Sequence, residues 1–382
     1  MSKKVNPKFH VWVPELFSNK GGIQVFSAFF VRGLQELYPT ADYQIFLKND
    51  RAIPSNTTYL PQTHFHSAGH WISWLKTPVF AIQLLIGGLW SRPDLIIATH
   101  LNFAIVAAWL NRFTGTPYWV VAHGVEAWNI KNSRVIQALH RADRILSVSK
   151  FTRDRLLQSH NFHPDRVTIL PNTFDPERLR IAPKPSHLLE KYRLQPQQKI
   201  ILTVSRLIDS EQYKGYQQVL LAMPQIRRTI PNVHYMIVGT GKDSDRILSL
   251  IHQLELQDCV TLTGFIPDAE LCDYYNLCDV FAMPSKREGF GIVYLEALAC
   301  GKPTLGGNQD GAVDALRQGE LGALVDPDNL TEIAETLVDI LEGNYANPLV
   351  YQAEALRHCV IDTYGFACFK QILDRYLQQQ LK

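Results

Sequence analysis

The chain has 382 residues, of which 46% are hydrophobic and 19% are charged, and its formal net charge is +2. This length is too great for one small core and is typical of two α/β domains of ordinary size. The hydrophobic fraction excludes an intrinsically disordered chain, because enough apolar surface is available to build buried cores.

The small net charge conceals a difference between the two halves of the chain. Residues 1–180 contain 20 Lys and Arg against 11 Asp and Glu, whereas the remainder contains 18 against 25. A basic N-terminal half is typical of contact with an anionic partner, either a membrane surface or an acidic acceptor, and scattered surface charge is the alternative. Nucleic acid is not predicted as a partner, since no block of Lys and Arg alternates with aromatic residues.

Several features of the chain predict a cytoplasmic protein. The N-terminal segment MSKKVNPK is not followed by the apolar region of a secretory signal. The longest apolar stretch, Pro78 to Trp90, is shorter than the roughly 20 residues that a membrane-spanning helix needs. No CxxC pair or zinc spacing is present, so buried, reduced thiols are predicted instead of disulfides or a metal cage. The six cysteines are Cys259, Cys272, Cys278, Cys300, Cys359 and Cys368.

In the first half of the chain, short apolar runs alternate with segments of helical period. Strands are predicted at Phe9–Val13, Tyr43–Leu47, Leu95–Thr99, Tyr118–Ala122, Ile145–Val148 and Val167–Leu170. Amphipathic helices are predicted between them, for example at Ile23–Tyr38 and Asn102–Phe113.

The alternation restarts after a proline-rich polar stretch at residues 176–198. Strands are predicted at Ile200–Ser205, His234–Val238, Val260–Thr263, Val280–Met283, Thr304–Leu305 and Ala323–Val325, and a last helix at Tyr364–Leu381. Continuous apolar strands that alternate with helices indicate parallel sheets covered on both faces. Two such series predict two doubly wound domains, with the ligand site at the carboxyl ends of the strands, in the cleft between the domains.

The most informative segment follows the strand predicted at Val280–Met283. It contains Glu288-Gly-Phe-Gly291 and leads into a helix that ends near Cys300. The two glycines let backbone N–H groups approach a ligand, and the helix N-terminus favours negative charge. Glu288 and Glu296 are eight positions apart, about 12 Å along a helix, a spacing suited to two hydroxyl-bearing parts of one ligand. An ordinary helix start with acidic residues is the alternative.

This segment resembles the E-x7-E signature of the retaining glycosyltransferases of family four, also called group 1. The resemblance extends from the Gly-Gly loop near the start of the chain to Leu-Val-Asp-Pro at residues 324–327. It implies the GT-B fold, in which two Rossmann-like domains face each other across a cleft. Residues 1–175 would bind the acceptor, residues 176–363 the nucleotide sugar, and the helix at residues 364–382 would pack back on the first domain.

The resemblance also assigns roles in donor binding. Glu288 corresponds to the carboxylate that contacts the donor sugar, and Glu296 to the one that contacts the ribose of the nucleotide. The loop between them would face the sugar and the phosphates through its backbone. The residues implied are Gly289, Phe290, Gly291 and Ile292.

Two upstream segments resemble the family's cationic grip on the diphosphate. The resemblance of residues 204–207 implies that Arg206 binds the diphosphate, and that of residues 213–216 implies the same role for Lys214. The insertion at residues 208–212 makes the separation of these two cations longer than is usual in the family. A diphosphate leaving group gains negative charge as the glycosidic bond breaks, and a cation 4 Å away contributes roughly 4 kcal/mol at an effective dielectric constant near 20. Solvated surface charges are the alternative reading of these residues.

Two loops of the second half resemble parts of the family's donor pocket. The Val-Gly-x-Gly turn at residues 238–241 would line the donor pocket through Gly239. The loop at residues 263–266 would bind the nucleotide base through the backbone of Phe265 and Ile266. Tight strand-to-helix turns without a ligand are the alternative.

Two loops of the first half resemble elements of the acceptor side. The loop at residues 18–23 would close over the diphosphate or position the acceptor, which implies Gly21 and Gly22. The His-Gly element at residues 122–126 implies that His123 hydrogen-bonds to the donor sugar and that Glu126 contacts the acceptor.

No metal or other cofactor is predicted. The two Asp-x-Asp strings, Asp243–Asp245 and Asp326–Asp328, each precede a predicted helix, where Asp is a favoured cap. The resemblance implies a retaining hexosyltransferase that uses a UDP- or GDP-linked sugar and a saccharide or glycolipid acceptor. Transfer would proceed by front-face displacement, catalysed by His123, Arg206, Lys214 and Glu288.

Other readings of the chain stay open. A nucleotide-sugar epimerase or a phosphorylase would use the same scaffold, and a non-catalytic protein would bind a sugar nucleotide or a membrane surface without turnover. Residues 70–76 and the apolar run at residues 78–90 would either lie on an anionic bilayer at the inner face of a membrane, with Trp and Lys at the interface, or pack as a helix on the first sheet.

Overall fold

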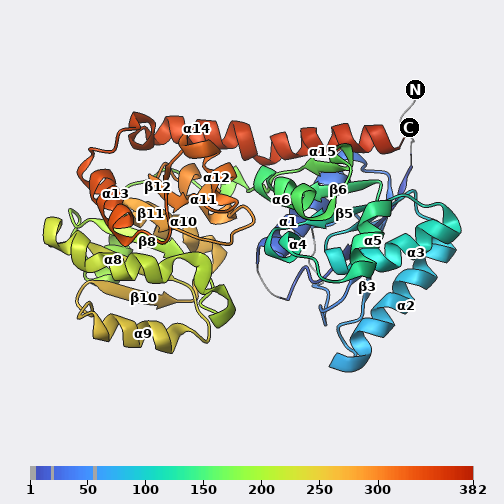
Figure 1. Ribbon diagram of the computed structural model, residues 1–382, viewed down its shortest axis with the longest axis horizontal. Helices are drawn as coiled ribbons and strands as arrows, with labels where there is room; N and C mark the ends of the chain where they lie inside the picture. Colours follow the sequence, from blue (N-terminus) through green and yellow to red (C-terminus); the bar gives the residue numbers. More distant parts are fainter. Residues whose placement is uncertain (1–5, 19–20, 55–57, 382) are drawn as a thin grey trace. The chain divides into compact units, whose positions relative to one another are not determined.

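The structure is a computed structural model that describes residues 6–18, 21–54 and 58–381 (Figure 1). The chain divides into two compact units. The first comprises Met1–Thr173 together with Phe366–Lys382, and the second comprises Phe174–Gly365. The C-terminal helix therefore belongs to the first unit, although it follows the second unit in sequence.

The described part of the first unit contains a seven-stranded parallel sheet in the order β3-β2-β1-β4-β5-β6-β7. Its strands are β1 (Lys8–Val13), β2 (Asp42–Leu47), β3 (Thr63–Ser67), β4 (Leu95–Ala98), β5 (Tyr118–Ala122), β6 (Arg144–Ser147) and β7 (Val167–Ile169). Strand β3 was not predicted, because its sequence THFHS has no apolar run. It lies at the edge of the sheet, where its residues are only partly covered.

Helices lie on both sides of this sheet (Figure 1). They are α1 (Gly22–Leu37), α2 (Ser73–Ser91), α3 (Ala104–Thr114), α4 (Val125–Trp128), α5 (Ser133–Arg141), α6 (Lys150–His160) and α15 (Phe366–Gln380), with short 3₁₀ turns η1 (Leu101–Phe103) and η2 (Pro164–Arg166). Helix α1 buries Phe26, Phe30 and Leu34, which recur every four residues on one face. Helix α15 packs on α1, with its Leu373 fully buried against Gly33.

The second unit contains a six-stranded parallel sheet in the order β10-β9-β8-β11-β12-β13. Its strands are β8 (Ile200–Val204), β9 (His234–Val238), β10 (Val260–Gly264), β11 (Val280–Met283), β12 (Thr304–Gly307) and β13 (Ala323–Val325). The central strands are buried along their whole length, as expected of a parallel sheet covered on both faces. The predicted fold class, two doubly wound α/β domains, is confirmed.

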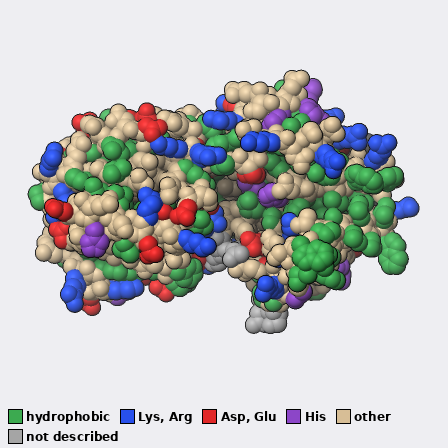
Figure 2. All heavy atoms as spheres, turned by 60° about the horizontal axis from the view of Figure 1, so that its bottom comes forward, with side chains coloured by type: hydrophobic (Ala, Val, Ile, Leu, Met, Phe, Trp, Pro, Cys, Tyr) green, Lys and Arg blue, Asp and Glu red, His purple; other side chains and the backbone are tan. Residues whose placement is uncertain are grey.

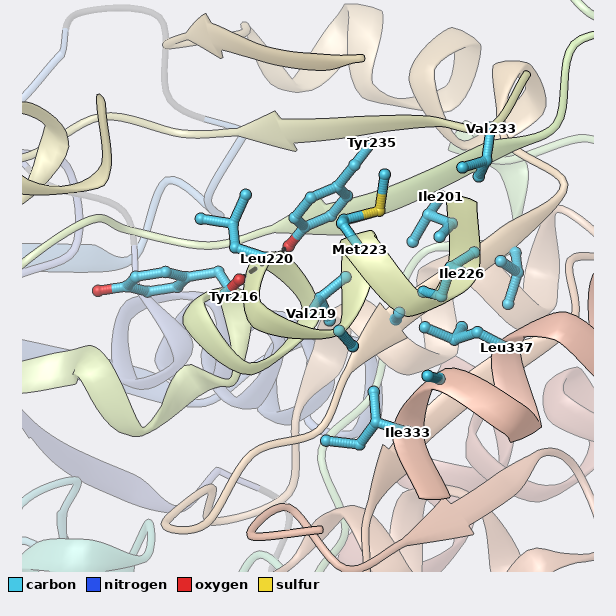
Figure 3. Packing of buried hydrophobic residues seen from close by; sticks show 14 of the residues in the cluster. Ile201, Tyr216, Val219, Leu220, Met223, Ile226, Val233, Tyr235, Ile333 and Leu337 are labelled. Carbon is cyan, nitrogen blue, oxygen red and sulfur yellow. Dashed lines mark hydrogen bonds between the residues drawn. The ribbon is translucent and has the colours of Figure 1, made fainter. Parts of the chain in front are cut away.

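The helices of the second unit are α7 (Ser186–Tyr192), α8 (Tyr216–Thr229), α9 (Ser244–Gln253), α10 (Asp268–Leu277), α11 (Ile292–Ala299), α12 (Ala312–Ala315), α13 (Leu330–Glu342) and α14 (Ala353–Tyr364), with 3₁₀ turns η3 (Pro176–Arg178), η4 (Asp209–Lys214), η5 (Arg317–Gly319) and η6 (Pro348–Tyr351). Figure 3 shows the core on one face of the sheet, where Val219 and Met223 of α8 lie near Ile333 and Leu337 of α13. The large aliphatic residues of both helices exclude water from the strands beneath.

Each sheet has one point at which the strand order reverses. This point lies between β1 and β4 in the first unit and between β8 and β11 in the second. The loops that leave neighbouring strands there diverge to opposite faces and open a crevice at the carboxyl edge, where ligands of doubly wound sheets bind. Most of the predicted site residues follow these strands or their immediate neighbours.

All six cysteines are unpaired. Cys259, Cys272, Cys278 and Cys300 are buried as predicted, whereas Cys359 and Cys368 on α14 and α15 are only partly buried. Within the part of the chain that the structure describes, no helix is both long and apolar enough to cross a membrane.

Candidate functional site

Two of the predicted site residues meet at the carboxyl edge of the second sheet. Lys214 at the end of η4 forms an ion pair with Glu288 in the loop after β11, and their side chains are 19% and 16% exposed. Burial lowers the pKa of the Lys214 ammonium, but the Glu288 carboxylate outweighs this effect, and the pKa is raised above its ordinary value. Lys214 is therefore charged at neutral pH and is held where the loops of β8 and β11 converge.

The backbone holds these two loops together. The amide of Lys286 donates to the carbonyl of Tyr213 at 2.9 Å. Gly215 has φ = +87°, and a Cβ at this position would overlap the carbonyl of Pro284, so the close approach requires glycine. The insertion at residues 208–212 forms most of the 3₁₀ turn η4, which is how Lys214 reaches Glu288 despite the longer spacing.

Arg206 follows β8 directly. Its guanidinium pairs with Glu211 of η4 and is 54% exposed, so it is accessible to a ligand at the strand end. The neighbouring strand β9 ends in Gly239, where a Cβ would overlap the carbonyl of Ser205. Gly239 thus lets the turn after β9 pack on the backbone beside Arg206.

A buried carboxylate, Asp310, positions the loop that carries Glu288. It accepts hydrogen bonds from the Glu288 amide at 2.7 Å, the Ala312 amide at 2.9 Å and the Ser285 hydroxyl at 2.7 Å. Burial raises the pKa of Asp310 to about 7, against the effect of these three donors. Asp310 was not predicted from the sequence, where its signal was an Asp-Gly pair before the short helix α12.

The rest of the loop offers a ligand backbone groups. The Phe290 ring is buried against Tyr364, with ring centroids 5.3 Å apart, and Gly289 is also buried. Gly291, at φ = +90°, is the N-cap of α11, and the helix begins at Ile292. Glycine has no side chain to cap the helix, and the Tyr294 amide donates to the Gly291 carbonyl at 3.2 Å. An anion suits the N-terminus of α11, where the helix dipole is positive.

The prediction that Glu288 and Glu296 lie about 12 Å apart along one helix was wrong, because only Glu296 is on a helix. Helix α11 begins only at Ile292, so Glu288 lies in the preceding loop and not on the helix. Glu296 lies on α11, where the Tyr275 hydroxyl donates to its Oε2 at 2.7 Å. Tyr275, which was not predicted as a site residue, fixes this carboxylate from α10.

The loop after β10 presents one aromatic ring to solvent. Phe265 is 69% exposed, whereas Ile266 beside it is buried. This loop is joined to the turn after β9, since the Gly239 amide donates to the Gly264 carbonyl at 3.0 Å. An exposed ring at this edge is suited to stacking on a planar base, in addition to the backbone contacts that were predicted.

In the first unit, His123 follows β5. Burial lowers its pKa to about 4, so the ring is neutral at pH 7. Its Nε2 lies 2.9 Å from the carbonyl oxygen of Thr99. Because a carbonyl only accepts, Nε2 carries the proton and Nδ1 is the acceptor. The Phe26 ring packs at nearly a right angle to the imidazole, with ring centroids 5.1 Å apart.

Glu126 contacts His123 directly. Its Oε1 accepts from the His123 amide at 2.6 Å, which orders the turn between β5 and α4. The structure therefore brings together the two residues that were predicted to serve the donor sugar and the acceptor.

The loop after β1 is held by another buried carboxylate, Asp50. It accepts from the amides of Leu16, Phe17 and Ser18 at 2.6–2.9 Å. Gly21 is the extended N-cap of α1, which begins at Gly22, and the intervening Asn19 and Lys20 lie outside the described residues. Asp50 was not predicted from the sequence, because no local pattern shows which amides its carboxylate binds.

The predicted capping roles of the two Asp-x-Asp strings were wrong. Asp243 precedes α9, but its carboxylate makes no cap and instead binds Arg246 and the Tyr216 hydroxyl. Helix α13 is capped by Asn329 and not by an aspartate. Across residues 6–18, 21–54 and 58–381, no group of three or more His, Cys, Asp or Glu side chains is arranged to hold a metal ion.

Two parallel-sheet α/β units, with cations and glycine-rich turns at a sheet's switch point, define the GT-B class. Sucrose-phosphate synthase from Thermosynechococcus elongatus has a TM-score of 0.82 to this chain at 19% identity, and the alignment covers 98% of both chains. HepE from Anabaena, solved in complex with UDP and glucose, has a TM-score of 0.78 at 18% identity, covering 98% of this chain and 100% of that chain. At such identities the similarity establishes the fold alone.

Residues 187–356 match the family described as glycosyl transferases group 1, and residues 21–178 match the one described as Glycosyltransferase Family 4. The chain therefore belongs to the group 1 glycosyltransferases.

Its relatives include a GDP-mannose-dependent alpha-(1-6)-phosphatidylinositol monomannoside mannosyltransferase of Mycobacterium tuberculosis, 33% identical over 208 residues. That alignment covers 52% of each protein, so the chain spans about half the length of this relative. An uncharacterized glycosyltransferase of Methanocaldococcus jannaschii is 28% identical over 279 residues, which cover 69% of this chain and 70% of that protein.

Proposed function

We propose that the protein is a retaining hexosyltransferase that moves a sugar from a UDP- or GDP-linked donor to a hydroxyl of a saccharide or glycolipid. The observation that carries this proposal is the Lys214–Glu288 ion pair beside Arg206, at the switch point of the second sheet. The relatives and structural neighbours add support, since one relative is named as GDP-mannose-dependent and one neighbour was solved with UDP and glucose.

The donor is proposed to bind by charge and hydroxyl complementarity. Arg206, Lys214 and the N-terminus of α11 receive the diphosphate, and Phe265 stacks on the base. Glu288 accepts hydroxyl groups of the sugar and Glu296 those of the ribose. When a phosphate takes over the charge of Lys214, Glu288 is released toward the sugar.

The reaction is proposed to proceed on one face of the sugar without a metal ion. The acceptor oxygen bonds to the anomeric carbon on the side from which the diphosphate departs, as the bond between that carbon and the phosphate oxygen breaks. The acceptor proton passes to the departing phosphate oxygen. Two cations stabilise the charge that develops there, and His123 accepts a hydrogen bond from a sugar hydroxyl at Nδ1.

Calorimetry and turnover assays with UDP-glucose, GDP-mannose and ADP-glucose test this proposal. We expect one donor to bind, Glu288→Gln to weaken binding at least 10-fold, and Glu335→Gln, an exposed carboxylate on α13, to bind normally. NMR of the product should show the anomeric configuration of the donor, and EDTA should not reduce turnover. An inverted product contradicts the retaining mechanism, and binding without transfer to any acceptor favours a non-catalytic binding protein.

We further propose that the first unit lies on an anionic membrane surface through an aromatic face formed by α2 and α3. Figure 2 shows hydrophobic side chains gathered on the surface of this unit. The aromatic face comprises Trp71, Ile72, Trp74, Ile82, Ile86, Leu89, Trp90, Trp109 and Phe113. Trp74 is 73% exposed and Trp90 is 90% exposed, whereas Phe80 and Leu84 on the opposite side of α2 are buried.

Charge complementarity favours a membrane as the partner of this face. Between Asp50 and Glu126 the sequence contains a single acidic residue, Asp94, and four Lys and Arg. The carboxylate of Asp94 accepts from the Lys8 amide. Exposed Trp with cations nearby and almost no acids is the composition of an interfacial helix on anionic lipid.

Flotation with vesicles tests the membrane proposal. The protein should float with vesicles containing 30% phosphatidylglycerol, and not with neutral ones. Trp74→Ser with Trp90→Ser should reduce flotation at least fivefold, whereas Leu248→Ser with Leu330→Ser, exposed residues of the second unit, should not. Absence of flotation together with a dimer in light scattering would assign the face to self-association instead.

A further inference from the structure

Two cavities at the carboxyl edge of the first sheet share the same two cations. One has a volume of about 500 Å³ and the other about 660 Å³, and both are lined by Arg51 and Lys76. Their walls come from the loops that follow β1, β2 and β3 and from the start of α2. This is the edge at which doubly wound sheets bind ligands, and the volumes are those of small-molecule sites.

The two cations are available to a ligand. Within the described part of the chain, neither Arg51 nor Lys76 forms an ion pair, in contrast to Arg206 and Lys214 of the second unit. The adjacent Asp50 is buried and forms no ion pair with Arg51, since its carboxylate binds the amides of the loop after β1.

The walls of the two cavities differ in their side chains. The larger cavity adds Glu15 and Ser18, which are suited to hydroxyl groups, beside the apolar Phe17, Ala52 and Pro54. The Glu15 carboxylate is kept in place by the amide of Gln24 at 2.7 Å. The smaller cavity contains no acidic side chain and adds His70, Ser73 and two members of the aromatic face, Trp71 and Ile72. The two cations are therefore common to both cavities, the carboxylate lines only the larger one, and the aromatic face reaches only the smaller one.

We infer that these cavities bind the head group of an anionic lipid-linked acceptor. The phosphoryl group lies between Arg51 and Lys76, its hydroxyl-bearing part enters the larger cavity toward Glu15, and its apolar chain leaves past Trp71 and Ile72 along the aromatic face. The inference rests on the proposed function, and it names the acceptor class that the transferase uses. A neutral soluble sugar would leave both cations and the apolar wall without partners.

The combination of a carboxylate, two cations and the aromatic face distinguishes this ligand from others. A free phosphate would use the cations alone, and a neutral lipid would use the apolar wall alone. Only a molecule with hydroxyls on one side of a phosphoryl group and an apolar chain on the other contacts the carboxylate, the cations and the aromatic face together. Any polar group of the cavities that loses water without gaining a ligand partner would reduce the affinity.

Calorimetry with soluble probes tests this inference without transferase activity. The probes are dihexanoyl phosphatidylglycerol, glycerophosphoglycerol, dihexanoylglycerol and inorganic phosphate, all below any micellar concentration. The phosphatidylglycerol should bind at least 10-fold more tightly than each of the others. Equal binding of inorganic phosphate would make the site one for free anions, and equal binding of dihexanoylglycerol would remove the cations from recognition; either result overturns the inference.

Matched variants locate the binding. Arg51→Gln with Lys76→Gln should weaken binding of dihexanoyl phosphatidylglycerol at least 10-fold. Arg134→Gln with Lys131→Gln makes the same change in charge at exposed positions outside the cavities and should leave binding unchanged. Both double variants should retain the circular dichroism spectrum and the urea-unfolding midpoint of the parent protein, which shows that they are folded. Unchanged probe binding in the Arg51 and Lys76 double variant overturns the inference.

The outcome is separable from that of the proposed function. If no acceptor supports turnover but the probe and variant results hold, the transferase proposal fails and the head-group site stands. If turnover occurs on a neutral soluble saccharide and the probe does not bind, the inference fails and the transferase proposal stands.

Discussion

Arg206 and Lys214 occupy different environments at the same sheet edge. Lys214 is largely buried against Glu288, whereas the Arg206 guanidinium is mostly exposed and pairs with Glu211. Both cations are thus held by carboxylates of their own unit. These pairs keep the cations in position and avoid the repulsion that two neighbouring positive charges would otherwise cause.

The Arg206→Ala variant should lower kcat by roughly 10²–10³, because one preorganised charge opposite the leaving diphosphate is lost. Steady-state kinetics with the best donor measures the effect. Arg228→Ala, which removes an exposed guanidinium at the end of α8, should retain normal turnover. Turnover of the Arg206 variant near that of the parent protein would exclude this residue from the reaction.

The neutral state of His123 predicts a pH dependence of stability. Its pKa is lowered from 6.5 to about 4 in the folded chain, so the unfolded chain binds a proton first as pH falls. The contribution of neutral His123 to the free energy of unfolding is fully present above pH 6.5 and is lost as pH falls toward 4. At pH 5 the loss is about 2 kcal/mol, at about 1.4 kcal/mol per pKa unit.

Urea unfolding at pH 7 and pH 5 checks this prediction. The loss of stability between the two values should be about 2 kcal/mol smaller in His123→Gln than in the parent protein. His252→Gln, at an exposed position on α9, should behave like the parent. Equal losses in all three proteins would mean that His123 is protonated in the folded state.

At the scale of elements, the loops after the parallel strands interlock through their backbones. A Cβ on Gly307, at the end of β12, would overlap the carbonyl of Ser285 after β11. The Ser285 hydroxyl in turn donates to Asp310, which holds the Glu288 amide. The position of Glu288 therefore depends on the ends of two adjacent strands.

Gly307→Ala should destabilise the protein by roughly 1–3 kcal/mol and weaken donor binding, because the backbone of β11 must move to admit a methyl group. Urea unfolding and calorimetry measure the two effects. Gly22→Ala, where nothing lies within 4 Å of the added carbon, should change stability by less than about 1 kcal/mol. Normal stability of the Gly307 variant would show that the contact between the two strand ends is not rigid.

At the scale of the whole molecule, the chain crosses between its units twice. It leaves the first unit after Thr173 and returns to it at Phe366. Leu373 and Leu377 of α15 are fully buried, and the Tyr376 hydroxyl donates to the Ile169 carbonyl at 2.8 Å. The C-terminal helix is thereby part of the core of the first unit.

Leu373→Ala should destabilise the first unit by about 2–5 kcal/mol, as expected for a large cavity beside α1. Hydrogen exchange should show loss of protection in residues 6–173 and not in residues 174–365. Gln371→Ala, at an exposed position on the same helix, should leave both units unchanged. Loss of protection confined to the second unit would contradict the assignment of α15.

The amino-acid sequence alone determined the fold class, because apolar strands alternating with helices required parallel sheets. The roles of Glu288 and Arg206 toward a sugar diphosphate are predictions from the resemblance to group 1 glycosyltransferases, since an ordinary helix start and solvated charges would show the same residue types. The fold class follows from local pattern. Strand β3 was missed for the same reason, because an edge strand with polar residues on both faces leaves no apolar pattern.

Tertiary structure alone decided which residues meet. Glu288 pairs with Lys214 across 74 positions of sequence, and Asp310 and Asp50 each bind several amides of a distant loop. Arg51 and Lys76 share their cavities because the loops of β1, β2 and β3 end at one edge. Such contacts depend on strand order and backbone packing, which are set by the burial of the whole core and not by any local segment.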